Sequence, residues 1–243
     1  MAIILCSLAL TVAVYLLVEG LIIQRLELEV RNNLQNEINL IGIKLQHSVE
    51  KINTVSEVIV SSIERNKHIS QEEFADLVTD LMAVTPEMRH AAAAPGLVIK
   101  FVHPMEDNAA AIGLDYRDVP SQLLPIRRVI QTNQIVLAGP VELVQGGQAF
   151  IGRTAVYIPD PSTGGRYFWG IVSVVFETAR IYHSIGLDQR SAFETAVVNL
   201  TAPGGLGKAT LFGNPSILRD NPVISEVAVL DGVWRIAAVS LPI

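Results

Sequence analysis

Few patterns in the chain have the residue types and spacing that catalysis or metal binding requires. The segment "GGLGK" (204–208) lacks the GxxxxGK[ST] form of a phosphate-binding loop, so it indicates a turn. No GxSxG nucleophile elbow occurs. The histidines form no pair with metal-ligand spacing on a helix, and no cysteines support them. The histidines are His47, His68, His90, His103 and His183. The sequence therefore predicts no metal site and no cofactor.

Two carboxylates are candidates for an acid–base pair. Asp115 and Glu142 could work together in principle, but nothing in the sequence brings them side by side, and turn or solvated roles are the alternative. A hydrolase would also need a nucleophile–base pair, which the sequence does not show. We therefore expect no catalysis by this chain.

The beginning of the chain is strongly apolar. Half of the 243 residues are hydrophobic, and the mean hydropathy is +0.39. Residues 1–18 contain no charged side chain and are about as long as a helix that spans a bilayer. A signal peptide would need a basic start and a small-residue cleavage site, which are missing, and a buried core helix is the other alternative. We predict a membrane helix over 1–20, and Arg25 and Arg31 after it weakly favour a cytoplasmic body.

Net charge and cysteine content limit the partners and the sources of stability. The net charge is −6, and no basic patch interleaved with aromatic residues occurs, so nucleic acid is not an expected partner. The single cysteine, Cys6, lies in the apolar start of the chain. Disulfides within the remainder are therefore excluded.

A long helix is predicted over residues 21–67, which contain no proline. Apolar residues recur there at steps of three and four, which is helical periodicity. They are Val30, Leu34, Ile38, Ile41, Leu45, Val49, Ile52, Val55, Ile59 and Ile63. This stripe could form a dimer seam, or it could pack on the chain's own domain. A second helix is predicted over 67–84, where Ser70 and Glu73 form a capping box.

The remaining sequence predicts an α+β fold with two antiparallel sheets. Strands are expected at 96–102, 110–116, 134–144, 148–158 and 166–177, with a helix over 120–133. After a short helix at 178–187, strands return at 193–200, 208–213, 223–230 and 233–241. We therefore expect a stalk helix at 21–67, a first sheet subdomain at 68–180 and a second at 181–243.

Several of these segments resemble a known family. The segments 104–116 and 139–158, together with the strand "FWGIVSVVFE", are similar to a CHASE domain in the same order along the chain. CHASE domains are extracytoplasmic sensors of transmembrane histidine kinases and of cyclic-dinucleotide enzymes. The resemblance implies a stalk helix and two PAS-like halves, with the ligand in the membrane-distal half. It also implies a body in the periplasm and an anchor in the inner membrane, against the weak charge argument.

The resemblance also implies binding residues, taken over position by position from the plant cytokinin receptors of the family. An acidic residue at the start of the crossover helix corresponds to Gln122, a backbone group to Val144, and a threonine to Arg153. Because a guanidinium suits a carboxylate or a phosphate, Arg153 favours a small anionic ligand over a cytokinin.

Other residues are expected to line the same space between sheet and helix. Ala111 and Gly113 would leave room for a ligand, or they are ordinary small residues beside a turn. The remaining candidates are Phe101, Tyr116 and Trp169. The sequence thus predicts a sensor that forms a homodimer through its stalk and serves a cytoplasmic diguanylate cyclase, phosphodiesterase or histidine kinase. The alternative is a membrane-anchored dimerisation or protein-interaction module without a small ligand.

Overall fold

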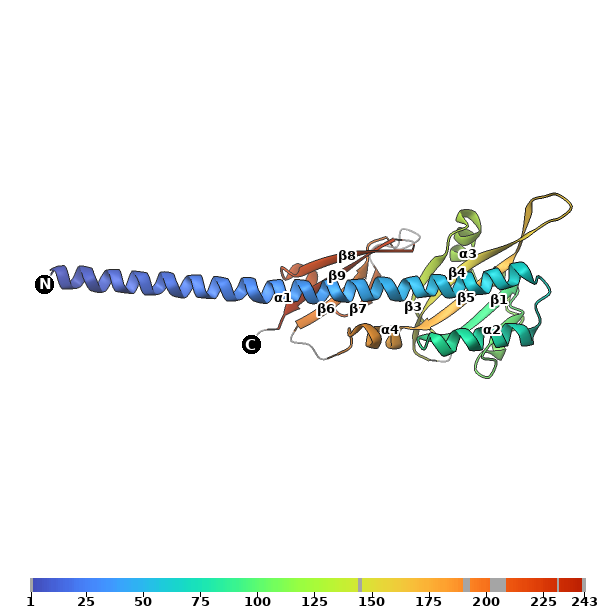
Figure 1. The fold of residues 1–243 in the computed structure, drawn as a ribbon, viewed down its shortest axis with the longest axis horizontal. Coiled ribbons are helices and arrows are strands. Elements are labelled where there is room, and N and C mark those ends of the chain that lie inside the picture. Colours follow the sequence, from blue (N-terminus) through green and yellow to red (C-terminus); the bar gives the residue numbers. More distant parts are fainter. Residues whose placement is uncertain (1, 144–145, 190–192, 202–208, 231, 242–243) are drawn as a thin grey trace.

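One long helix organises the whole chain. The computed structural model describes residues 2–143, 146–189, 193–201, 209–230 and 232–241. Helix α1 (Ala2–Arg65) runs along the length of the molecule, and two antiparallel sheets lie one after the other beside it (Figure 1). We call the sheet unit near residue 65 of this helix the distal unit and the other the proximal unit. The α+β architecture with two antiparallel sheets agrees with the sequence prediction.

The apolar stripe of α1 packs on the chain's own sheets. From Leu34 to Ile63, every predicted stripe residue is buried, whereas Val30 is 51% exposed. Over this stretch, the alternative of packing within the chain therefore describes the stripe. Apolar side chains on another part of the helix surface, such as Leu40 and Ile43, stay exposed.

A membrane span is not confirmed at the start of α1. Within the part of the chain that the structure describes, no helix combines the length and the apolar character needed to cross a membrane.

The distal unit has a five-stranded sheet with helices on both faces. Its strands are β1 (Met88–Pro95), β2 (Phe101–His103), β3 (Val136–Glu142), β4 (Gln148–Pro159) and β5 (Arg166–Glu177), in the order β2-β1-β5-β4-β3. Helices α1 and α2 (Gln71–Val84) cover one face, and α3 (Pro120–Thr132) covers the other. The capping box of α2 is confirmed, because Ser70 and Glu73 bond each other's backbone N–H.

One predicted strand of the distal unit is wrong, and another is shorter than predicted. Residues 110–116 form no strand and instead contain two short 3₁₀ turns, Ala109–Ala111 and Tyr116–Asp118. The Asp115 carboxylate accepts the Arg117 backbone N–H and so ties the second turn. The strand predicted at 96–102 is reduced to β2, because Gly96 and Leu97 take positive φ angles and turn the chain. The preceding strand, β1, was not predicted.

The proximal unit is smaller and also packs on α1. Its order is β7-β6-β9-β8, from strands β6 (Phe193–Asn199), β7 (Ala209–Phe212), β8 (Val223–Val229) and β9 (Gly232–Ser240). A 3₁₀ turn, η3 (Pro215–Arg219), precedes β8, and helix α4 (Thr178–Ile185) connects the two units. The predicted boundary at residues 180 and 181 falls inside this connecting helix.

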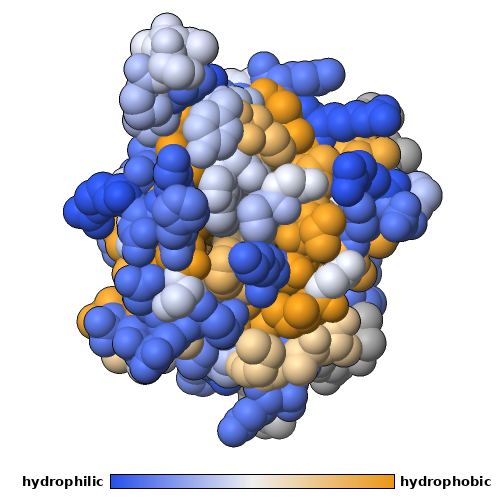
Figure 2. Space-filling model, turned by 90° about the vertical axis from the view of Figure 1, so that its right-hand side faces the viewer, coloured by the Kyte–Doolittle hydropathy of each residue, from blue (hydrophilic) through white to orange (hydrophobic). Residues whose placement is uncertain are grey.

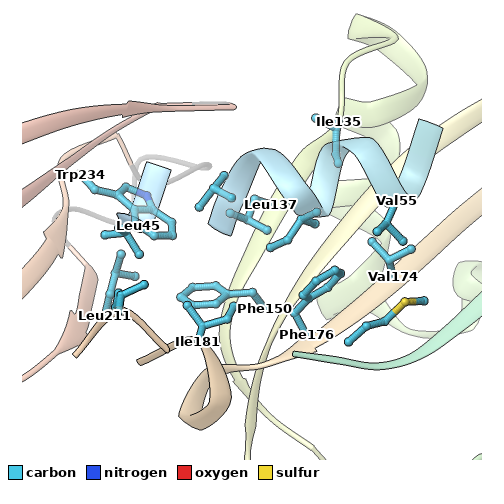
Figure 3. Packing of buried hydrophobic residues seen from close by; sticks show 14 of the residues in the cluster. Leu45, Val55, Ile135, Leu137, Phe150, Val174, Phe176, Ile181, Leu211 and Trp234 are labelled. Atoms are coloured by element: carbon cyan, nitrogen blue, oxygen red, sulfur yellow. The ribbon is translucent and has the colours of Figure 1, made fainter. Parts of the chain in front are cut away.

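A continuous core joins the two units along α1. Figure 3 shows Phe150 of β4 between the units, close to Trp234 of β9 and Ile181 of α4. The Phe150 and Trp234 rings are stacked with centroids 5.4 Å apart, and Phe150 meets the Tyr182 ring edge-on at 6.3 Å. Because the same aromatic residues serve both units, a movement of one unit relative to the other must rearrange this cluster.

Candidate functional site: a buried arginine beneath helix α3

The candidate site lies on the face of the distal sheet that α3 covers. Strand pairing sets Arg153 opposite Val136 on β3 and opposite Ser173 on β5, and Ser173 opposite Ala92 on β1. Directly paired residues of antiparallel strands share a face, so these four residues form one row across the sheet. The row continues into the buried cluster that includes Ile126 of α3.

Polar side chains meet in the middle of this otherwise apolar cluster. The Arg153 guanidinium donates through Nη2 to Gln122 Oε1 of α3 at 2.6 Å. The hydroxyls of Tyr116 and Ser173 lie 3.1 Å apart. Arg153, Tyr116 and Ser173 are only 4%, 3% and 5% exposed, so the cluster is closed to solvent in this structure. We call Gln122, Tyr116, Arg153 and Ser173 the α3 polar cluster.

The charge on Arg153 is not balanced. No described Asp or Glu forms an ion pair with it, and its buried Nε has no hydrogen-bond partner among the described residues. Burial lowers the pKa of the Arg153 guanidinium, although an arginine keeps its proton in proteins. A buried cation with one neutral partner costs folding free energy, and such costs are typical of functional sites.

A histidine lies on the same face, one row away. His90 precedes Ala92 by two residues on β1 and therefore points to the same side of the sheet. Burial, with a smaller effect from the neighbouring charge of Arg89, lowers the pKa of His90 to about 4. Its Nδ1 is buried and unpartnered among the described residues. At neutral pH this ring is uncharged and has a free hydrogen-bonding atom.

The sheet beneath α3 carries several short side chains, because they are alanines. Ala92, Ala94 and Ala155 belong to the buried cluster and carry only methyl side chains. Of the small residues predicted to leave room, Ala111 packs against this cluster. Gly113 is exposed, a Cβ added to it would meet no atom within 4 Å, and its φ is +84°. Its role in the fold is therefore the turn rather than space beneath α3.

The remaining predicted site residues are not brought to this cluster. Phe101 lies on the opposite face, where its ring centroid is 5.9 Å from that of Phe74 on α2. Trp169 packs against the core cluster on the α1 side. Val144 lies outside the described residues. The structure thus groups Gln122, Tyr116 and Arg153, with Ala111 at their edge, and adds Ser173 and His90, which the sequence did not indicate.

Few side chains of helix α3 anchor it over the cluster. Only Ile126 and Val129 of its residues are buried, and Leu124 is 62% exposed. Its first residue follows Val119, which provides no side-chain cap, and Pro125 inside the helix has no N–H to donate. The first turn of α3 is therefore weakly held apart from the bond between Gln122 and Arg153.

Two hollows lie elsewhere on the described surface. One of about 510 Å³ is found between the units, lined by residues that include Thr178, Tyr182 and Phe212. A larger one of about 1220 Å³ runs along α1 beside β9, near Leu26 and Val239. Neither is lined by a residue of the α3 polar cluster.

Solved structures share the fold at low sequence identity. An extracellular ligand-binding receptor from Desulfohalobium retbaense is 14% identical over 85% of this chain, with a TM-score of 0.65. This chain spans 40% of that receptor's length. The ligand-binding domain of the Pseudomonas aeruginosa amino acid chemoreceptor PctC, in complex with GABA, is 11% identical, with a TM-score of 0.60 and coverage of 86% and 98%.

A further neighbour is the ligand-binding domain of the Campylobacter jejuni chemoreceptor Tlp3 in complex with L-valine. It is 10% identical, with a TM-score of 0.51 and coverage of 86% of this chain and 93% of that one. No protein with a curated description matches. The CHASE domain family matches residues 43–206, well over half of the sequence. The chain therefore belongs to the CHASE family of sensor domains.

Proposed function

We propose that this chain is an extracytoplasmic sensor for a small ligand that carries a carboxylate or phosphate group, bound by Arg153 beneath α3. The observation that carries this proposal is the buried guanidinium with no countercharge among the described residues. An anion entering the cluster would pair with Arg153 and occupy its free Nε donor. The proposal places ligand binding in the distal half, residues 68–180, with 181–243 as the proximal half.

The ligands of two neighbours support an anionic group. PctC is in complex with GABA and Tlp3 with L-valine, and each of these molecules has a carboxylate. Their identities to this chain are too low to transfer a binding residue. They support a carboxylate group in the ligand and nothing about its other substituents, and the position of Arg153 suggests the contact.

Entry of a ligand would require the first half of α3 to lift. Strand β4 holds this helix at two points, through Arg153 to Gln122 and through the Tyr157 hydroxyl, which donates to the Ile130 carbonyl at 3.1 Å. Between them, Pro125 interrupts the helical hydrogen bonds. A ligand that replaces Gln122 on Arg153 would free the first turn and leave the second attachment in place.

The rest of the receptor is inferred from the sequence and the family. Attachment to the inner membrane through residues 1–18, with the sensor in the periplasm, stays a prediction. Homodimer formation through the stalk would use the exposed apolar side chains Leu40 and Ile43. The activity of a cytoplasmic diguanylate cyclase, phosphodiesterase or histidine kinase would change in response to the movement of α1. Such signalling requires the ligand to bind one of two receptor states more tightly.

Thermal-shift screening of the purified 243-residue chain tests the ligand proposal. The library should be rich in carboxylates, phosphates and purines, because a bound ligand raises the apparent melting temperature by mass action. We expect hits that disappear in Arg153→Met and persist in Arg127→Met, a matched change at an exposed position of α3. Hits that persist in Arg153→Met would refute the role of Arg153.

A second candidate function is a protein-interaction module with no small ligand. The closed state of the α3 polar cluster favours it, as do the hydrophobic patches among hydrophilic side chains at the distal end (Figure 2). Exposed apolar residues of the distal unit include Ile112, Leu124 and Tyr167. A folded chain that responds to no member of the library would favour this candidate.

A further inference from the structure

The α3 polar cluster contains a single charged group. Arg153 is its cation. Asp118, in the same 3₁₀ turn as Tyr116, is exposed and lies near the charge of Arg117. Asp115 accepts hydrogen bonds from the Arg117 guanidinium. Glu177 lies four residues along β5 from Ser173, roughly 13 Å away at strand spacing, and pairs with Arg180 at 2.8 Å. Among the described residues, no carboxylate forms a hydrogen bond or an ion pair with the side chains of Gln122, Tyr116, Arg153 or Ser173.

The other basic groups near this face add no charge to the cluster. Arg89 donates to the Gly146 carbonyl at the β3–β4 turn, and Arg127 of α3 is exposed. Arg128 of α3 is half-buried and, among the described residues, forms no hydrogen bond with the cluster. His90 pairs with Val175, so it is a diagonal neighbour of Ser173, at a typical spacing of about 7–8 Å. Because its lowered pKa keeps it neutral at pH 7, it presents a hydrogen-bonding nitrogen without a charge.

From this distribution of charges, we propose that the site selects carboxylates whose other polar groups are uncharged, namely oxo, hydroxy or unsubstituted acids, and rejects the matching amino acids. The inference rests on the proposed function and defines its ligand class. A monoanion neutralises the single cation of the cluster. An amino acid brings an ammonium group as well, and that group would be buried near Arg153 with no carboxylate to accept it.

His90 gives the uncharged part of the ligand a partner. The free Nδ1 accepts a hydrogen bond from a ligand hydroxyl in one tautomer and donates to an oxo group in the other. Among the described residues of the cluster, an ammonium would find this neutral ring, the hydroxyls of Tyr116 and Ser173 and the Gln122 amide oxygen, none of which carries a charge. Hydrogen bonds from an ammonium to neutral acceptors are weaker than its pairing with a carboxylate. Because the cluster offers no carboxylate, the site disfavours the amino acid.

Isothermal titration of the 243-residue chain with matched compounds tests the inference. Each set keeps the carbon skeleton and changes one substituent: L-valine against 2-hydroxy- and 2-oxo-3-methylbutanoate, L-alanine against lactate and pyruvate, and 4-aminobutyrate against 4-hydroxybutyrate and butyrate. We expect an acid of at least one set to bind, and to bind at least tenfold more tightly than its amino partner. Equal or tighter binding of the amino acid would refute the proposed ligand class. The proposed role of Arg153 in binding a carboxylate would stand. If no acid in any set binds to the folded chain, this inference fails. The proposed function fails with it only if the thermal-shift library, which also contains phosphates and purines, gives no hit that depends on Arg153.

Two variants of His90 sharpen the test. His90→Asp places a carboxylate beside the cluster, and His90→Asn is its neutral match. We expect the preference for the acid to be at least tenfold lower in His90→Asp than in His90→Asn, because only the first variant adds a charge, whereas both remove the imidazole. An unchanged preference in a folded His90→Asp protein would show that the charge at this position does not decide the ligand class.

Discussion

Replacing Arg153 by methionine separates a binding residue from a structural one. Methionine is similar in length, fills irregular space and has no charge to desolvate. If Arg153 is kept for a ligand, it destabilises the ligand-free chain, and its removal should stabilise the fold. If Arg153 instead holds α3 in place, its removal should destabilise the fold.

The contacts of Arg153 determine the expected size of the effect. The variant loses one hydrogen bond from a charged donor to Gln122, which contributes about 1.5–3 kcal/mol. It also removes a cation that is 4% exposed and has no countercharge in the described part of the chain, and the burial of such a cation costs several kcal/mol. Gln122 is half-buried and can turn toward water. We expect the free energy of unfolding to rise by about 1–3 kcal/mol, in the range seen when buried ionic groups are replaced by apolar ones.

Urea denaturation followed by circular dichroism, without added ligand, measures this change. In a thermal melt of a chain of this size, each kcal/mol of unfolding free energy moves the melting temperature by roughly 2–4 °C. Arg127→Met is the control and should change the unfolding free energy by less than about 0.5 kcal/mol, since it alters an exposed position of the same helix. A loss of more than about 1 kcal/mol in Arg153→Met would refute the reasoning and make the guanidinium a structural support of α3.

Three other changes have defined outcomes. Gly152→Ala should lower the unfolding free energy by about 1–3 kcal/mol in denaturant titration, because a Cβ there would lie 2.6 Å from a side-chain carbon of α1, whereas exposed Gly165→Ala should have little effect. Ser70→Ala should cost about 1 kcal/mol through the lost cap. The Ser70 backbone N–H, and to a smaller extent the Ser70 side chain, lower the pKa of Glu73. Ser70→Ala keeps the backbone donor and loses only the contribution of the side chain, which should disappear as the pH falls through the lowered pKa; melting curves at pH 7 and pH 3 would reveal it. The pKa of His90 is about 4 in the folded chain and near 6.5 in the unfolded chain, so between these values only the unfolded chain takes up the proton. The free energy of unfolding should therefore fall by about 2–3 kcal/mol from pH 7.5 to pH 4.5. The fall should be less steep in His90→Gln.

Local signals in the sequence were sufficient for the helices. The cap at Ser70 and Glu73 depends on residues three apart, and the stalk stripe repeats every three or four residues. Both were correctly predicted for that reason. The stripe alone could not tell packing within the chain from packing between chains, because that depends on where the sheets fold back.

The strands at the site were harder to predict, because their residues are small. β1 contains the run "AAAA", and alanine is depleted in strands, so its strand character comes from pairing with β2 and β5. Similar small residues in 110–116 predict a strand, although they form 3₁₀ turns. In each case contacts between distant segments overrode the local preference.

The site itself depends on still longer separations. Gln122 and Arg153 are 31 residues apart, and Tyr116 and Ser173 are 57 apart. The family resemblance pointed to Gln122 and Arg153, because their positions follow from the order of the family's segments along the chain. Nothing local marks Ser173 or His90, since a single serine or histidine within an apolar strand has no motif. Their place in the site follows from strand register alone.

The alternation of strand β4 brings the proposed ligand contact next to the stalk. Arg153 faces α3, while its neighbour Gly152 faces α1, where a Cβ would meet Ile52. Only glycine permits this close approach, so the stalk rests directly on the backbone that carries Arg153. A ligand that draws the guanidinium toward α3 would therefore pull on the peptide unit in contact with α1. Coupling of binding to stalk movement would then need no long chain of residues through the core, and Gly152→Ala should weaken the receptor's response in a folded protein even when ligand binding persists.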